Sequence, residues 1–193
     1  MRITGGQHRS RALKAPRGQA TRPTSDRVRE ALFGILGARM DLSGVRVLDL
    51  YAGTGALALE ALSRGAARAT LVEKGREAVA AIRENVEALG LGPSVVILTT
   101  AVERAARMLE PGAFDLVFAD PPYVDVASGE AVRALEDVVR AGALAEGAVV
   151  VLEHAPNREN AEQNAPGPGV EGLSHTETRR YGDTCLSFYE RRP

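Results

Sequence analysis

The chain has 193 residues, of which 45% are hydrophobic and 25% charged, a balance typical of one soluble globular domain. No apolar run approaches the ~20 residues that a membrane-spanning helix needs, and the N-terminus lacks the apolar stretch of a signal peptide. Cys185 is the only cysteine, which excludes an internal disulfide, and the histidines are too scattered to suggest a metal site. We therefore expect a metal-free protein of the reducing cytoplasm, with no integral membrane segment and with Cys185 in the core.

The net charge of -1 conceals a strongly basic N-terminus. Residues 1–30 hold eight Arg and Lys against two acids, a net charge of +6, so the remaining residues carry -7. A basic arm on an acidic body is typical of a segment that meets nucleic-acid phosphates, although some of these side chains could be solvated or paired with the acidic body. The predicted RNA contacts are Arg2, Arg9, Arg11, Lys14, Arg22 and Arg27. We expect a basic N-terminal extension over residues 1–30 and a single domain over residues 31–193.

Apolar segments alternate with helical periods along most of the chain. Residues 1–24 predict a short strand or two followed by a loop, and Thr24 or Ser25 is a suitable cap for a helix that ends near residue 39. The predicted strands then cover residues 45–50, 69–73, 95–99, 114–119 and 148–153, and a closing strand, antiparallel to its neighbour, covers 185–191. The predicted helices cover residues 56–64, 76–89, 101–109 and 129–141. Strands that are apolar throughout and alternate with helices favour an α/β fold with a doubly wound, mostly parallel sheet.

A glycine-rich turn follows the first buried strand. Gly53-x-Gly55-x-x-Ala58 satisfies the pattern of dinucleotide-binding enzymes, in which glycine lets the backbone approach a ligand closely. Asp49 argues against a dinucleotide, because its carboxylate would repel a pyrophosphate but suits a cationic head group such as the amino end of S-adenosylmethionine. The alternative for Asp49 is a structural role in the turn or as a helix cap.

Glu73 follows the second strand, 18 residues after Gly55. An acid at this place accepts hydrogen bonds from ribose hydroxyls. Glu73 therefore indicates a nucleoside ligand, but it fits a dinucleotide and S-adenosylmethionine equally well. The alternative is a solvated glutamate at the end of a strand.

The fourth strand runs directly into Asp120-Pro121-Pro122-Tyr123, the most specific motif in the sequence. Two prolines fix the backbone and donate no hydrogen bond, so the carbonyl groups there are held rigidly. Asp120 and the Pro121 carbonyl could each accept one hydrogen of an exocyclic base amine, which would turn the nitrogen lone pair toward a methyl donor. The ring of Tyr123 offers a face on which an extruded base can stack. The alternative is a proline-stiffened turn that ends a strand.

Four stretches of the chain resemble the bacterial 16S ribosomal RNA guanine-N2 methyltransferases of the RsmD type. They are residues 2–7, residues 22–33, residues 49–65 and residues 120–123. The resemblance covers essentially the whole chain and implies a seven-stranded, Rossmann-like class I methyltransferase fold with S-adenosyl-L-methionine as cofactor. It also implies a monomer that acts on 16S rRNA within the small ribosomal subunit or an assembly intermediate.

The resemblance assigns residues to the two parts of the site. The expected catalytic residues are Asp120, Pro121, Pro122 and Tyr123. The expected cofactor-binding residues are Asp49, Ala52, Gly53, Gly55, Glu73, Ala101, Val102 and Thr24, with Arg27 also near the mouth of the site. Many relatives have an acid or Asn after the third strand, where this chain has Thr100. We therefore expect the adenine to contact the backbone and the apolar surface of Ala101 and Val102.

Other functions stay open at this point. The same Pro-Pro-Tyr chemistry serves adenine-N6 methylation of nucleic acids and methylation of a protein glutamine amide. An RNA-binding module without catalytic activity is a further alternative, which the intact Asp120 and Tyr123 disfavour. A dehydrogenase would leave the motif at residues 120–123 unexplained. The region from His154 to residue 180 carries no motif that we can assign.

Overall fold

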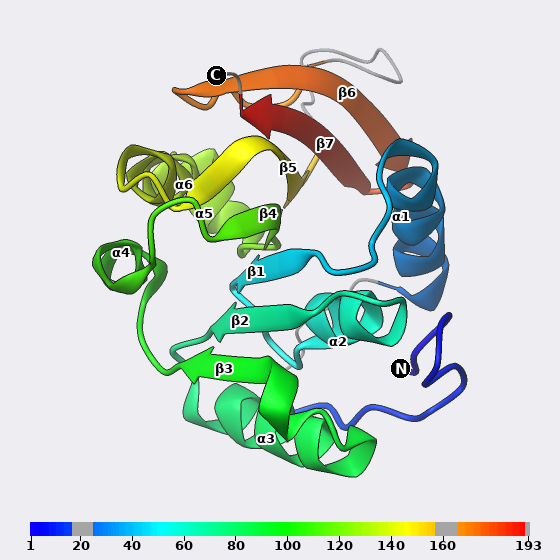
Figure 1. Cartoon of the computed structure of the whole chain (residues 1–193). Helices are drawn as coiled ribbons and strands as arrows, with labels where there is room; N and C mark the ends of the chain where they lie inside the picture. Colours follow the sequence, from blue (N-terminus) through cyan, green and yellow to red (C-terminus); the bar gives the residue numbers. More distant parts are fainter. Residues whose placement is uncertain (17–24, 157–165, 192–193) are drawn as a thin grey trace. The chain divides into compact units, whose positions relative to one another are not determined.

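The computed structural model describes residues 1–16, 25–156 and 166–191, and the chain forms two compact units, residues 1–101 and residues 102–193 (Figure 1). The first contains α1 (Asp26–Arg39), β1 (Arg46–Leu50), α2 (Ala56–Ser63), β2 (Arg68–Val72), α3 (Arg76–Leu89), the 3-10 turn η1 (Gly92–Ser94) and β3 (Val95–Leu98). The second contains α4 (Val102–Ala105), the 3-10 turn η2 (Ala106–Met108), β4 (Phe114–Ala119), α5 (Tyr123–Ala127), α6 (Glu130–Arg140), β5 (Leu144–His154), β6 (Leu173–Tyr181) and β7 (Thr184–Arg191).

The strands of the first unit are parallel and lie in the order β3-β2-β1. Four consecutive residues of β1, 47–50, are buried, as expected for a strand covered on both faces. α2 and α3 pack closely, because a Cβ atom built on Gly55 would lie 2.9 Å from the Leu71 side chain of β2 and 3.6 Å from Ile82 of α3. The alternation of buried strands and covering helices is what the sequence predicts.

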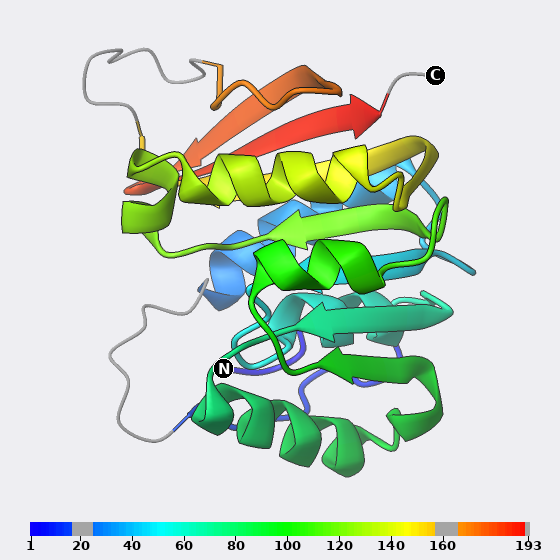
Figure 2. The same cartoon turned by 90° about the vertical axis from the view of Figure 1, so that its left-hand side faces the viewer.

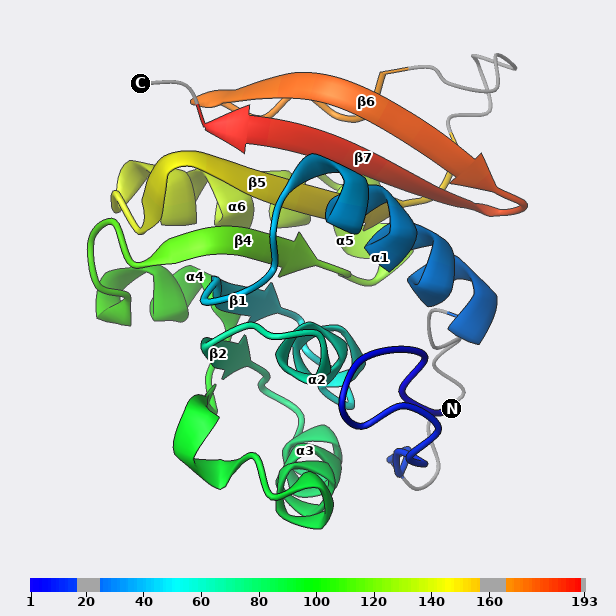
Figure 3. The ribbon, with the colours of Figure 1, turned by 45° about the vertical axis from the view of Figure 1, so that its right-hand side comes forward.

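The N-terminal segment, residues 1–16, is held against α2 by buried side chains and hydrogen bonds (Figure 3). Ile3 is fully buried and Leu13 is 6% exposed, and one isolated bridge joins Arg2 to Ala12. The short strand predicted here is therefore replaced by a single bridge. A Cβ atom built on Gly6 would lie 1.8 Å from the Ser63 carbonyl oxygen, so glycine is required for this close approach.

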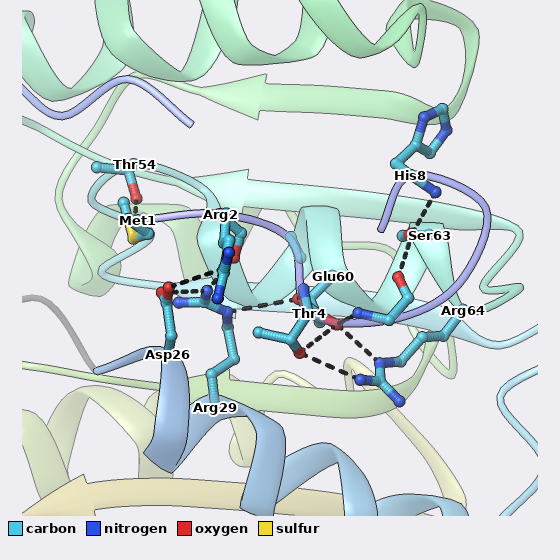
Figure 4. Close-up of polar contacts among 12 residues, drawn as sticks. Met1, Arg2, Thr4, His8, Asp26, Arg29, Thr54, Glu60, Ser63 and Arg64 are labelled. Carbon is cyan, nitrogen blue, oxygen red and sulfur yellow. Dashed lines mark hydrogen bonds and ion pairs between the residues drawn. The ribbon is translucent and has the colours of Figure 1, made fainter. Parts of the chain in front are cut away.

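The buried carboxylate of Glu60 is the centre of this attachment (Figure 4). It accepts hydrogen bonds from the backbone N–H groups of Thr4 and Gly5, each at 2.7 Å, and from the Thr4 hydroxyl at 2.8 Å. Arg64 donates to it at 2.9 Å, and Nε of the fully buried Arg29 lies 3.5 Å from it. One carboxylate thus joins the N-terminal segment, α1 and α2.

In the second unit the strands lie in the order β4-β5-β7-β6, with β4 parallel to β5 and both later pairs antiparallel. α6 covers one face of β4 and β5 (Figure 2), and its buried positions are Ala131, Ala134, Leu135 and Val138. The closing antiparallel strand is confirmed as β7, and Cys185 in it is buried as predicted. Burial raises the pKa of the Cys185 thiol.

Several elements differ from the expectation. β6 was not predicted because most of its residues are polar, and of its nine residues only Thr178 is buried. α5 was not predicted because a helix of five residues, directly after two prolines, is too short to show a helical repeat of hydrophobic residues. The helix expected at residues 101–109 is a short α-helical turn followed by a 3-10 turn. Within the described residues, no helix combines the length and the apolar character that crossing a membrane requires.

Glu60→Gln should reduce the free energy of unfolding by about 3–5 kcal/mol, because the amide keeps one acceptor oxygen and leaves the buried Arg29 without its full charge partner. Urea denaturation of the variant measures this loss. Glu87→Gln, the same change on the exposed face of α3, is the control and should shift stability by less than about 0.5 kcal/mol. Equal losses in the two variants would show that the buried cluster contributes nothing specific.

Candidate functional site

The glycine-rich turn after β1 has an unusual backbone. Gly53 and Gly55 have φ angles of 56° and 76°, and Tyr51 has a φ of 61° although it is not a glycine. A side chain in this region costs on the order of 1–3 kcal/mol and is found mainly at functional sites. Tyr51 carries no sequence signal for this conformation, so sequence reasoning missed it.

The two glycines serve different purposes. Gly55 is needed for packing, since an added Cβ atom would meet Leu71. Around Gly53 an added Cβ atom would meet, among the described residues, only the Tyr51 carbonyl oxygen, at 3.9 Å, so this part of the chain leaves open space beside the backbone. A turn with an open glycine face is where a ligand can approach the main chain. Ala52 completes the turn, because its carbonyl accepts a hydrogen bond from Gly55 N–H at 2.7 Å.

Glu73 fastens the turn to the end of β2. One carboxylate oxygen accepts from Gly53 N–H at 2.9 Å and the other accepts from Gly75 N–H at 2.7 Å. Glu73 is half-buried, and a carboxylate can accept about four hydrogen bonds. Two acceptor positions are thus available for ribose hydroxyls, and the carboxylate is already oriented.

Asp49 is only 1% exposed and accepts a hydrogen bond from Ala58 N–H of α2 at 3.1 Å. The structure thus contains the helix-capping interaction that was the alternative reading of this residue. This hydrogen bond connects the start of α2 to β1, and it thereby holds the glycine turn between the two elements.

The residues expected to flank the adenine follow β3. Ala101, the last residue of the first unit, is half-buried. Val102, the first residue of α4, is 4% exposed, so it presents little surface. Thr24, the remaining residue of the expected cofactor set, lies outside the described residues, as does Arg22.

The motif at residues 120–123 joins β4 to α5. Asp120 is half-buried and Pro121 is buried, while Pro122 caps α5 and its carbonyl accepts from Asp125 N–H at 2.9 Å. Among the described residues no donor reaches the Pro121 carbonyl. A buried carbonyl group normally has a hydrogen-bond partner, so this oxygen is suited to accept one from a ligand.

Tyr123 is the first residue of α5 and is 37% exposed. Its hydroxyl lies 2.8 Å from the Thr184 hydroxyl, 3.4 Å from the Asp183 carbonyl oxygen and 3.5 Å from a carboxylate oxygen of Glu153. The hydroxyl end of the ring is therefore held by protein, and part of the ring remains accessible. Sequence reasoning missed Glu153 and Thr184, because they lie 30 and 61 residues away along the chain.

The basic N-terminal residues differ in the contacts that their side chains make. Arg2 pairs with Asp26 at 3.8 Å, Arg11 donates to the Ala88 carbonyl oxygen at 2.8 Å, and Lys14 pairs with Glu84 at 2.5 Å. These contacts match the alternative that some of the cations pair with the body. All five described cations of the predicted RNA set are nevertheless exposed: Arg2, Arg9, Arg11, Lys14 and Arg27.

The histidines of the second unit belong to a chain of hydrogen bonds across β5, β7 and β6. His154 contacts the Ala155 carbonyl oxygen and the Ser187 hydroxyl, each at 2.8 Å. Ser187 lies 2.7 Å from the Thr178 hydroxyl, which lies 2.8 Å from His175. Burial lowers the pKa of His154, which favours the neutral imidazole. Within the described part of the chain, no three His, Cys, Asp or Glu side chains are grouped to hold a metal ion.

One protein family and several known proteins match this chain. The model of the family described as "Conserved hypothetical protein 95" matches residues 1–190. The Ribosomal RNA small subunit methyltransferase D of Escherichia coli K12 is 40% identical over 153 residues, which are 79% of this chain and 74% of that protein. YlbH of Bacillus subtilis, named for rRNA methyltransferase activity, is 34% identical over the full length of both proteins.

Among solved structures, the Escherichia coli protein yhhF, which is named as a methyltransferase, shares 33% identity. The alignment has a TM-score of 0.81 and covers 100% of this chain and 98% of that one. This likeness confirms the predicted class I methyltransferase fold with a seven-stranded, mostly parallel sheet. The chain therefore belongs to the family described as "Conserved hypothetical protein 95", the RsmD-type family of ribosomal RNA methyltransferases.

Proposed function

We propose that this protein transfers a methyl group from S-adenosyl-L-methionine to the exocyclic N2 of a guanine in 16S ribosomal RNA. The observation that carries the proposal is the arrangement at the end of β4, where the half-buried Asp120, the buried Pro121 and the exposed Tyr123 follow one another. Relatives named as rRNA small subunit methyltransferases support the nucleic acid, and the chemistry of the motif supports an exocyclic amine.

The amine is a weak nucleophile because its lone pair is delocalised into the ring of the base. Acceptance of one amine hydrogen by Asp120 and of the other by the Pro121 carbonyl favours a tetrahedral nitrogen and directs its lone pair outward. The methylated amine is acidic, and Asp120 or water takes its excess proton. Stacking on Tyr123 stabilises the extruded base by roughly 1–3 kcal/mol.

The residues of the glycine turn fit the cofactor. The open space beside Gly53 admits a ligand to the main chain, and Glu73 has acceptor capacity for a ribose. Asp49, Ala52 and Gly55 hold the turn in place. When bound, S-adenosyl-L-methionine supplies an electrophilic methyl group on a positively charged sulfur. The protein's own contribution is to orient the amine for in-line approach and to keep water away.

The RNA is held by exposed cations of the N-terminal segment and α1, above all Arg9 and Arg27. We further propose that the protein acts as a monomer in the cytoplasm, on RNA in the small subunit or an assembly intermediate. Three experiments test the reaction, the cofactor contact and the RNA contact separately.

Asp120→Ala should reduce methyl transfer by at least about 100-fold, because an acceptor for the reacting amine is lost, while cofactor affinity changes little. The assay uses labelled methyl donor and small subunits from a strain that lacks the enzyme, followed by identification of the nucleoside. Asp125→Ala, the same change on α5, is the control and should retain activity. N6-methyladenosine as the product, or full turnover by Asp120→Ala, would refute the proposal.

Glu73→Ala should raise the Kd for S-adenosyl-L-methionine by about 5- to 150-fold, the effect of losing hydrogen bonds worth about 1–3 kcal/mol. Calorimetric titration measures the change, and Glu77→Ala on the exposed start of α3 is the control. Unchanged affinity would mean that Glu73 serves only to hold the glycine turn.

Arg9→Ala should weaken RNA binding and reduce the slope of log K against log salt by about 0.7–0.9, the effect of one lost phosphate contact. The slope is measured by titrating the RNA at several salt concentrations. Arg68→Ala removes the same charge at the start of β2, away from the N-terminal segment, and should leave the slope unchanged. An equal change of slope in the two variants would show that Arg9 makes no specific contact with an RNA phosphate.

A further inference from the structure

The hydroxyl group of Tyr123 lies near polar groups of three residues, which come from two other places in the second unit. Thr184 and Asp183 lie at the tip of the β6–β7 hairpin, and Glu153 lies near the end of β5. The contact with the Thr184 hydroxyl, at 2.8 Å, is the shortest. A base that only stacks on an aromatic face does not require these partners, so their presence calls for a role.

We propose that Thr184 and Glu153 are positioning residues that hold the Tyr123 ring in the plane on which the target base stacks. The inference rests on the proposed function, since it assigns these residues to the same methyl-transfer site. A tyrosine side chain turns about χ1 and χ2. Hydrogen bonds at the hydroxyl oxygen restrict χ1, and they favour one ring plane about χ2 because the phenolic O–H bond prefers to lie in the plane of the ring. A ring restricted in this way presents its exposed face in one orientation, which lowers the entropy lost when the base stacks.

The donors and acceptors around the phenol fit one another. A phenol has one O–H donor and also accepts, and an ionised carboxylate only accepts. Tyr123 can thus accept from the Thr184 hydroxyl at 2.8 Å while its own O–H points toward the more distant Asp183 carbonyl oxygen and Glu153 carboxylate, at 3.4 and 3.5 Å. Glu153 is 7% exposed, and a carboxylate buried to this degree needs a donor. The Tyr123 hydroxyl is one such donor, so ring and carboxylate stabilise each other's placement.

The hairpin that carries Thr184 is itself fixed. Tyr181 and Thr184 form the last pair of the β6–β7 ladder, which leaves a loop of two residues, Gly182 and Asp183. Gly182 has a φ of 64°, a conformation that two-residue hairpin loops use and that favours glycine. Arg180 Nε also donates to the Gly182 carbonyl oxygen at 2.9 Å. The folded hairpin therefore gives the Thr184 hydroxyl a defined position.

A double-mutant cycle tests the inference with the full chain, small subunits and S-adenosyl-L-methionine. Thr184→Val removes the hydroxyl and keeps the shape, and it should lower kcat by about five- to tenfold with little change in the KM for the cofactor. Thr184→Ser should restore most of the activity. In a Tyr123→Phe background, Thr184→Val should cause no further loss, because its partner is already gone.

Thr176→Val is the matched control, because the Thr176 hydroxyl on β6 donates to the Phe188 carbonyl oxygen. It should leave kcat unchanged in both backgrounds. An equal loss from Thr184→Val with and without the Tyr123 hydroxyl, or no loss in either, would overturn the inference. Failure of the proposed function is recognised separately, because the wild-type protein would then form no N2-methylguanosine.

Discussion

The buried carboxylate of Glu60 is the interaction on which the first unit depends. A carboxylate removed from water is costly unless donors and cations surround it. Here the donors come from residues 4–5 and from Arg64, and the buried Arg29 forms an ion pair with it at 3.5 Å. The Arg64 guanidinium also lies 5.0 Å from the centre of the Phe33 ring of α1. These contacts turn a glycine-rich, basic N-terminus into a fixed part of the fold.

Fixing the N-terminal segment also connects it with the cofactor turn. Asn85 of α3 is buried, accepts from the backbone N–H of Lys14 at 2.7 Å, and donates to the carbonyl oxygens of Lys14 and Thr54, each at 3.1 Å. One amide group thus joins the end of the basic segment to the glycine turn. The cations that remain exposed, such as Arg9, are displayed from a rigid base, so less entropy is lost when they bind phosphate.

Most of the fold could be predicted from the sequence, because local patterns determine it. The predicted bounds of α3 and β4 are confirmed residue for residue. In α3 a helical period ends at a glycine, and β4 is a short run that is apolar except for Asp115. β6 escaped prediction because an edge strand buries few side chains, and its sequence therefore resembles a loop.

The candidate site could be predicted only in part, because some of its residues depend on partners that are distant in the sequence. The motif at residues 120–123 and the glycine turn are contiguous in sequence, and their chemistry follows from the residues themselves. The burial of Arg29 and the support of Tyr123 depend on partners far along the chain. A charge count treats Arg29 like Arg9, although one is fully buried and the other exposed.

The two-residue tip of the β6–β7 hairpin has a consequence for how the protein responds to heat. β6 is an edge strand with a single buried residue, and the ends of such strands open locally at a lower free-energy cost than the core. Fraying of the last pair, Tyr181 with Thr184, would release the Tyr123 hydroxyl while β4 and β5 stay intact. Thermal inactivation should consequently begin below the temperature at which the sheet melts, so a full circular-dichroism signal would not by itself indicate an active protein.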